Sequence, residues 1–203
     1  MENINNNAII EKNNNENKPL FNRIVASLLE YVEILVFSLA VVVVLFVFAV
    51  RLCEVKGDSM NKTLLNGEKL LVSNLFYEPE GGDIIVFHQT GALNEPVVKR
   101  VIAVGGETVD IDFDTMTVTV TDKNGVSRML DEDYAFYDKS RSGRYSDFDF
   151  PLEIPEGYLF VMGDNRYNSL DSRFKKIGLV DERRVLGKVI FRVTPFEKMG
   201  VVD

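Results

Sequence analysis

The 203-residue sequence predicts a mainly β protein, with antiparallel sheets packed as a barrel or sandwich, preceded by one transmembrane helix. Two observations support this prediction. An uncharged apolar run covers residues 34–50, and its only polar residue is Ser38. The chain beyond it consists of short β-branched or aromatic runs separated by glycine-containing turns, a pattern typical of antiparallel sheets.

The first 19 residues are rich in Asn, Glu and Lys and contain few apolar side chains. Such a segment cannot bury enough apolar surface to offset the entropy that ordering removes. We therefore expect residues 1–23 to form a disordered tail.

Residues 24–51 are expected to form the membrane anchor. As a helix, the apolar run would rise about 25 Å, near the lower limit for crossing a bilayer. Residues 28–32 extend it by about one turn. A cleaved signal peptide and a buried core helix are the alternatives, but the run is longer than a usual signal-peptide core and no clear small-x-small cleavage site follows. Nearby Lys and Arg residues are equally frequent on both sides, so charge does not fix the orientation.

Residues 52–203 are expected to form the β-rich domain. Its predicted strands cover residues 69–72, 83–87, 97–104, 115–120, 158–162 and 185–193. Residues 108–155 are interpreted as a small inserted subdomain or loop region, with a long surface loop at 131–150. Such a domain is large enough to bury one hydrophobic core.

The composition restricts the possible partners. A net charge of −8 argues against nucleic acid as a partner, because nucleic-acid binding relies on basic surfaces. Cys53 is the only cysteine, so no intrachain disulfide can form, and we interpret it as a small apolar side chain near the interface. No metal or other cofactor is implied.

Ser59 follows the apolar run by nine residues, which span at most about 30 Å. A nucleophilic serine needs a base. The only histidine, His88, ends a predicted strand and has no serine or acid motif nearby, so we interpret it as an ordinary strand-end residue. Lys99 can act as a base only if burial lowers its pKa. It shares a strand face with Val97 and Val101, but both faces are mostly apolar, so an exposed edge position remains an alternative.

Two further segments have a polar, turn-forming character. Gly57 permits a sharp bend just before Ser59, and a backbone amide at such a bend can donate to an oxyanion, although Gly-Asp-Ser is also a common turn. Residues 163–173 form a polar loop after a predicted strand. Asp171 and Arg173 can pair there, and Ser169 can orient an amine.

Together these segments resemble bacterial type I signal peptidase. The resemblance runs from the apolar run to Phe196 and rests on four boxes in order: residues 57–64, 82–87, 99–107 and 163–173. It implies Ser59 as the nucleophile and Lys99 as the general base, with the Ser59 amide at the oxyanion. It also implies that Met60 lines the site, that Ser169 orients Lys99, and that Asp171 and Arg173 form a structural pair.

Three positions depart from the family pattern. Lys62 stands where proline is usual, so the turn loses a fixed φ. Gly57 replaces a serine that assists the oxyanion in some members. Residues 174–178 look one or two residues longer than usual. None of these changes removes a group with a catalytic role.

The resemblance implies a membrane-anchored, single-pass serine endopeptidase that is monomeric, needs no cofactor and has its catalytic domain outside the cytoplasm. Its substrates would be signal peptides of exported preproteins, extended in the site with small side chains at −1 and −3. A non-catalytic, membrane-anchored peptide-binding domain is the alternative function. A self-cleaving repressor of the same serine–lysine clan would need a DNA-binding domain, which the apolar run and the acidic charge disfavour.

Overall fold

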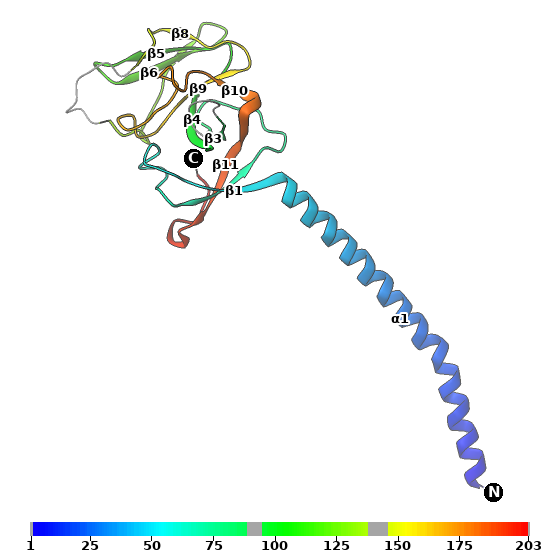
Figure 1. Cartoon of the computed structure of the whole chain (residues 1–203). Coiled ribbons are helices and arrows are strands. Elements are labelled where there is room, and N and C mark those ends of the chain that lie inside the picture. The colour runs from blue at the N-terminus through cyan, green and yellow to red at the C-terminus, as the bar shows by residue number, and fades with distance from the viewer. Residues whose placement is uncertain (1, 89–94, 138–145, 203) are drawn as a thin grey trace. The chain divides into compact units, whose positions relative to one another are not determined.

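The structure is a computed structural model that describes residues 2–88, 95–137 and 146–202. The chain divides into two compact units, residues 1–48 and 49–203. The first unit consists of helix α1, and the second contains the strands (Figure 1).

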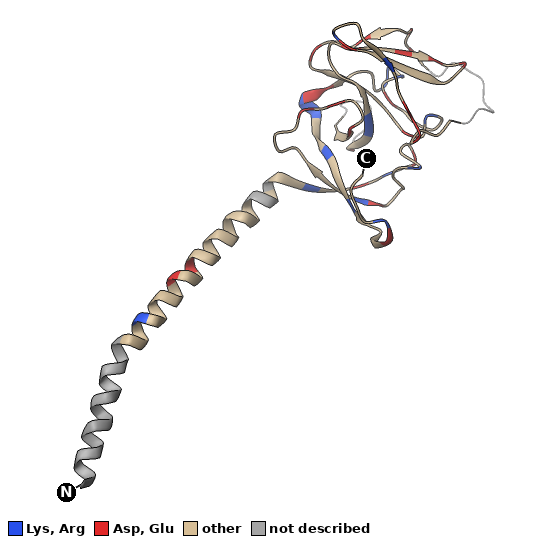
Figure 2. Ribbon diagram, turned by 180° about the vertical axis from the view of Figure 1, so that it is seen from behind, with Lys and Arg blue, Asp and Glu red and all other residues tan. Residues whose placement is uncertain are grey.

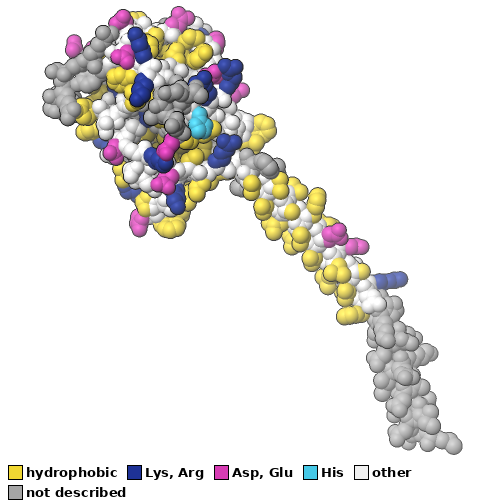
Figure 3. All heavy atoms as spheres, viewed as in Figure 1, with side chains coloured by type: hydrophobic (Ala, Val, Ile, Leu, Met, Phe, Trp, Pro, Cys, Tyr) yellow, Lys and Arg dark blue, Asp and Glu magenta, His cyan; other side chains and the backbone are white. Residues whose placement is uncertain are grey.

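Helix α1 (Glu2–Ala49) contains a segment long and apolar enough to cross a membrane, Leu20–Val44, with a mean hydropathy of 2.2. The described side chains of this segment are exposed apart from a half-buried Val25, and apolar groups line its length (Figure 3). Its charged residues lie toward its N-terminal end (Figure 2). The helix also includes residues 2–19, where the sequence predicts disorder. A polar segment can make helical hydrogen bonds without burying apolar surface, so its composition alone does not exclude a helix.

The larger sheet has seven strands in the order β1-β2-β11-β3-β4-β9-β10, and all of its pairs are antiparallel. These strands are β1 (Val50–Glu54), β2 (Lys69–Ser73), β3 (Ile84–Phe87), β4 (Val97–Ala103), β9 (Tyr158–Met162), β10 (Val180–Asp181) and β11 (Val185–Thr194). Register shifts interrupt β11 against both of its neighbours. The smaller sheet has the order β7-β6-β5-β8 and comprises β5 (Thr108–Asp112), β6 (Thr117–Thr121), β7 (Ser127–Met129) and β8 (Leu152–Glu153).

Both faces of the central strand β3 are buried. Ile84 and Val86 pack into one apolar cluster with Met60, whereas Ile85 and Phe87 pack into another with Val101 and Val161. A third cluster fills the space between β4, β9 and the smaller sheet. The segment that contains Ser59 and the strand that contains Lys99 are therefore both packed against β3. Two short 3-10 helices, η1 (Glu182–Arg184) and η2 (Phe196–Lys198), precede and follow β11.

The predicted fold class, mainly β behind one apolar helix, is confirmed. The described part of the predicted surface loop at 131–150 forms no helix or strand and is mostly exposed or partly exposed, although Ala135 and Ser146 are buried. Residues 138–145 of that prediction lie outside the described residues. Cys53 lies in β1 and packs against the cluster that contains Met60, and burial raises the pKa of its thiol.

Candidate active site

Ser59 and Lys99 are 40 residues apart in sequence but in direct contact. The distance from Lys99 Nζ to Ser59 Oγ is 2.6 Å, and the amine also donates to the Val98 carbonyl at 2.9 Å. A serine hydroxyl and an amine at this separation can exchange a proton without rearrangement.

The pairing of β4 with β9 explains how these residues meet. Arg100, next to Lys99, is opposite Met162, and the polar loop 163–173 begins directly after Met162. That loop holds the turn that contains Ser59. The amide of Asn165 donates to the Ser59 carbonyl at 2.9 Å, and its side-chain amide donates to the Asp58 carbonyl at 3.1 Å.

Lys99 is the buried member of the pair, with 3% of its surface exposed. Burial lowers the pKa of its amine to about 8, even though the nearby carboxylates of Asp171 and Asp164 raise it. The exposed edge position left open by the sequence is therefore wrong, because β4 lies between β3 and β9 in the sheet. An amine with this pKa is neutral in a useful fraction of molecules near neutral pH.

The turn around Ser59 contains a glycine with a positive φ, a buried methionine and a backbone amide without an acceptor among the described residues. Gly57 has a φ of +82°, a conformation that strains any residue with a side chain, and its amide donates to Asn66 Oδ1 at 2.9 Å. Met60 is 1% exposed and lines the cleft in front of Ser59. Within the described part of the chain, the backbone amide of Ser59 has no acceptor, so it is available to a developing oxyanion.

Asp171 and Arg173 form a fully buried pair. Arg173 Nε and Nη2 each donate to one carboxylate oxygen of Asp171 at 2.8 Å, and the Gly163 amide donates to the same carboxylate at 3.0 Å. Burial raises the pKa of Asp171, but the charge of Arg173 and the hydrogen bonds from Arg173 and Gly163 lower it by more, so the pKa falls below its usual value.

Ser169 lies beside the turn that contains Ser59, but its hydroxyl makes no hydrogen bond to Lys99. A Cβ on Gly163 would overlap Ser169 Oγ and the Ser59 carbonyl, so the three groups are closely packed. The two partners of Lys99 Nζ in the described structure are Ser59 and Val98. The orienting role of Ser169 stays a prediction.

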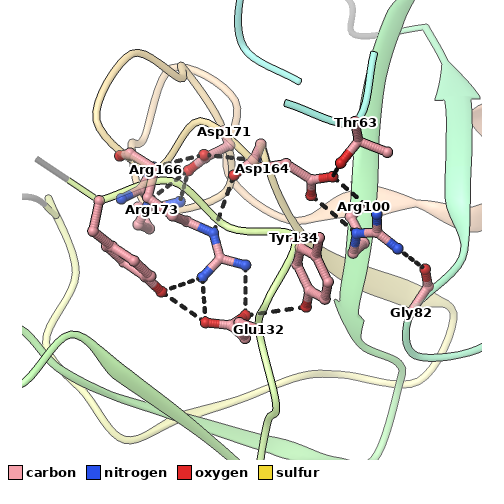
Figure 4. A network of polar contacts seen from close by, with 11 residues as sticks. Thr63, Gly82, Arg100, Glu132, Tyr134, Asp164, Arg166, Asp171 and Arg173 are labelled. Carbon is pink, nitrogen blue, oxygen red and sulfur yellow. Dashed lines mark hydrogen bonds and ion pairs between the residues drawn. The ribbon is translucent and has the colours of Figure 1, made fainter. Parts of the chain in front are cut away.

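A second buried carboxylate, Asp164, was not predicted from the sequence; it faces Arg100 and Thr63 (Figure 4). Arg100 Nε and Nη2 each donate to it at 2.9 Å, and Thr63 Oγ1 donates to it at 2.5 Å. Arg100 follows Lys99, and Thr63 lies four residues after Ser59. Asp164 thus connects the strand that contains Lys99 to the segment that contains Ser59. Its position next to Gly163 in the polar loop was the signal available in the sequence.

Arg166 pairs with Glu132, which comes from the segment predicted to be a surface loop (Figure 4). The guanidinium donates to both carboxylate oxygens at 2.5 and 2.6 Å. The backbone of the same segment joins the polar loop, since the Phe136 amide donates to the Asp164 carbonyl at 2.7 Å and the Arg166 amide donates to Phe136 at 3.0 Å. This segment therefore supports the polar loop through both side-chain and backbone contacts.

A cleft of about 450 Å³ lies in front of Ser59 and Lys99. One wall is formed by residues 55–60 and the other by residues 95–99, with Asn168 and Leu170 completing the lining. His88 is not among the lining residues. It is exposed at the end of β3 (cyan in Figure 3), and its amide donates to the Arg184 carbonyl. A separate cavity of about 480 Å³, between Tyr77 and Glu156, contains neither Ser59 nor Lys99.

The chain was compared with known proteins. Residues 28–194 match the family model described as signal peptidase, peptidase S26. A signal peptidase IB of Staphylococcus aureus strain Mu50 is 35% identical over 186 residues, covering 84% of this chain and 92% of that protein. A signal peptidase I of Bacillus licheniformis is 34% identical over 184 residues, covering 87% and 94%. A crystal structure of a signal peptidase I from Enterococcus faecalis V583 is 35% identical and covers 56% of this chain and 97% of its own, with a TM-score of 0.42.

Proposed function

We propose that this chain, which belongs to the signal peptidase family S26, cuts its substrates with a serine–lysine dyad formed by Ser59 and Lys99. Membership of this family makes the chain a peptidase that cleaves signal peptides. The observation that carries the proposed dyad is the 2.6 Å contact between Ser59 Oγ and a buried lysine whose pKa is lowered to about 8.

In the first half of the reaction, the neutral amine of Lys99 takes the hydroxyl proton of Ser59 as Oγ attacks the scissile carbonyl carbon. The carbonyl oxygen becomes an oxyanion, which the Ser59 backbone amide stabilises. When the tetrahedral intermediate collapses, the C–N bond breaks. The Lys99 ammonium then gives its proton to the leaving amine, which departs as the new N-terminus of the mature protein.

In the second half, the signal peptide remains bound to Ser59 as an ester. Neutral Lys99 takes a proton from water, and the resulting hydroxide attacks the ester carbonyl. Collapse of the second intermediate breaks the C–O bond and returns the proton from Lys99 to Ser59 Oγ. The lysine therefore serves as base and acid in turn, as the histidine of a conventional triad does.

The cleft suits an extended peptide chain. Its walls are residues 55–60, which follow β1, and residues 95–99, which lead into β4, so an extended substrate between them can hydrogen-bond to backbone on either side. We expect small substrate side chains at −1 and −3 next to the apolar lining formed by Val55, Met60 and Val98.

Helix α1 is proposed to anchor the chain as a single pass in the bilayer, with a monomeric peptidase domain outside the cytoplasm. Support comes from the exposed apolar side chains of Leu20–Val44 and from the substrates, which are cut after export. In intact spheroplasts, added protease should digest residues 52–203. Protection of that domain together with digestion of the N-terminal tail would contradict this orientation.

The dyad is tested by cleavage of a purified preprotein. Ser59→Ala and Lys99→Ala should each abolish cleavage while circular dichroism shows a folded domain. His88→Ala is the matched control and should keep nearly full activity, because His88 lies outside the cleft. Substantial turnover by either dyad variant would exclude the mechanism, and loss of activity in His88→Ala would point to a histidine base. Binding without cleavage by the unmodified protein would instead support the alternative, a non-catalytic peptide-binding domain.

A further inference from the structure

The two walls of the cleft are joined by side chains at both ends. At one end Ser59 and Lys99 meet at 2.6 Å. At the other end Lys56 Nζ lies 2.7 Å from Glu95 Oε2. Lys56 precedes Ser59 by three residues and Glu95 precedes Lys99 by four, and all four residues line the cleft. The second contact is thus an ion pair across the opening that a substrate has to occupy.

The spacing fixes which part of a substrate meets this pair. Residues in an extended chain rise about 3.3 Å each, so the four residues from Glu95 to Lys99, which run into β4, correspond to at most about 13 Å. A peptide that follows this wall with its scissile carbonyl at Ser59 therefore passes Glu95, and the Lys56 paired with it, up to about four residues from the bond that is cut. This position is beyond the −1 and −3 side chains expected near Ser59.

We propose that Lys56 and Glu95 are specificity-determining residues, which set the charge that the enzyme accepts about four residues from the scissile bond. The proposal rests on the proposed function, because it requires cleavage at Ser59. As a pair, the two side chains present almost no net charge to the substrate. Either one alone would select a substrate side chain of the opposite sign.

The surroundings indicate that the pair acts through charge and not through packing. Both side chains are well exposed, 63% for Lys56 and 60% for Glu95, so neither fills a core position. The hydrogen bond and charge of Glu95 raise the pKa of Lys56, and Glu54 raises it further. Lys56 therefore remains charged across the working range. Asp58 is the other acidic residue in the cleft lining, and the substitutions described below leave it in place.

The test measures kcat/KM for signal-peptide substrates that carry Glu, Gln or Lys singly, four or five residues before the scissile bond or three to five after it. For Glu95→Gln, the preference for Glu over Lys should rise about two- to fivefold at one of these positions, the size typical of an exposed charge pair. For Lys56→Gln, it should fall by a similar factor at the same position. The exchanged pair, Lys56→Glu with Glu95→Lys, should return the preference toward that of the unmodified enzyme.

Lys123 and Glu156 provide the matched control. They also form an exposed pair at 2.7 Å, but they lie outside this cleft, so Glu156→Gln should leave the charge preference unchanged. The effects at Lys56 and Glu95 should shrink in 1 M salt, where the screening length is about 3 Å. Unchanged preferences in both cleft variants, while cleavage still requires Ser59, would overturn this proposal alone. If no substrate is cut in a Ser59-dependent manner, the proposed function fails instead.

Discussion

The pKa of Lys99 makes the mechanism testable by pH. A lysine with an ordinary pKa near 10.5 would be neutral in about 0.03% of molecules at pH 7. With the pKa lowered to about 8, the neutral fraction becomes about 9%, roughly 300-fold more. Burial of Lys99 thus raises the fraction of molecules with a neutral Lys99 amine at pH 7 by about two and a half orders of magnitude.

We therefore expect kcat/KM to rise about tenfold per pH unit below pH 8 and to level off above it. The assay follows cleavage of a purified preprotein between about pH 6 and pH 10.5 with substrate well below KM, so that the limb reports the free enzyme. A limb centred near 10.5 would show that Lys99 is not desolvated, and the proposed mechanism would then lack its base.

Asp171→Asn checks that this limb belongs to Lys99. The Asp171 carboxylate is the largest of the influences that raise the pKa of Lys99, so its removal should move the limb to lower pH. Breaking a buried ion pair costs about 3–5 kcal/mol, so the assay needs a temperature at which the variant remains folded. A limb that moves to higher pH, or does not move, would assign the titration to another group.

Two further predictions concern stability. Lys99→Met should raise the free energy of unfolding at pH 7 by about 3 kcal/mol, because the folded state depresses the lysine pKa from 10.5 to about 8 and therefore disfavours the ammonium. As pH rises from 8 to 10.5, where the unfolded state binds more protons, the unfolding free energy of the unmodified protein should approach that of Lys99→Met. Urea unfolding at several pH values measures this difference. A difference that does not change with pH would refute the prediction. At position 62, where φ is +90°, Lys62→Gly should keep or slightly raise stability, whereas Lys62→Pro should lower it by about 3 kcal/mol, because proline fixes φ near −65°. Equal melting temperatures for these two variants would show that residue 62 does not need a positive φ.

The strands that the sequence predicts are those in which β-branched residues form an apolar run. β4 and β9 are examples, since their side chains are buried on both faces. β1 was missed because its apolar residues continue the run of α1, and composition alone does not show where a helix ends and a strand begins. β5 was also not predicted, although its buried residues alternate with exposed or partly exposed ones, as expected for a strand with one face in the core.

The residues with proposed chemical roles were predictable only in part. Ser59 and Lys99 belong to motifs that resemble those of a known family, and the structure places them in contact. Their support was harder to foresee. Glu132 contributes to the polar loop from a segment whose charges and aromatics suggested an exposed surface, and the ion pair with Arg166 is what allows its burial. Sequence composition records that a charge is present, but only tertiary contacts decide whether it is paired.

This pairing explains why Lys99 is the residue whose pKa falls so far. Among the described residues, every other buried charged side chain has an opposite charge within salt-bridge distance. The buried members of these pairs are Glu68, Asp83, Arg100, Asp164, Arg166, Asp171 and Arg173. Asp164 and Asp171 are the two carboxylates that raise the pKa of Lys99. Each accepts two hydrogen bonds from the guanidinium of one arginine, Arg100 or Arg173. Because the arginines occupy these carboxylates, burial removes water from Lys99 without giving its amine an oppositely charged partner within salt-bridge distance in the part of the chain that the structure describes. Burial therefore favours the neutral amine, which is the form that the proposed reaction needs.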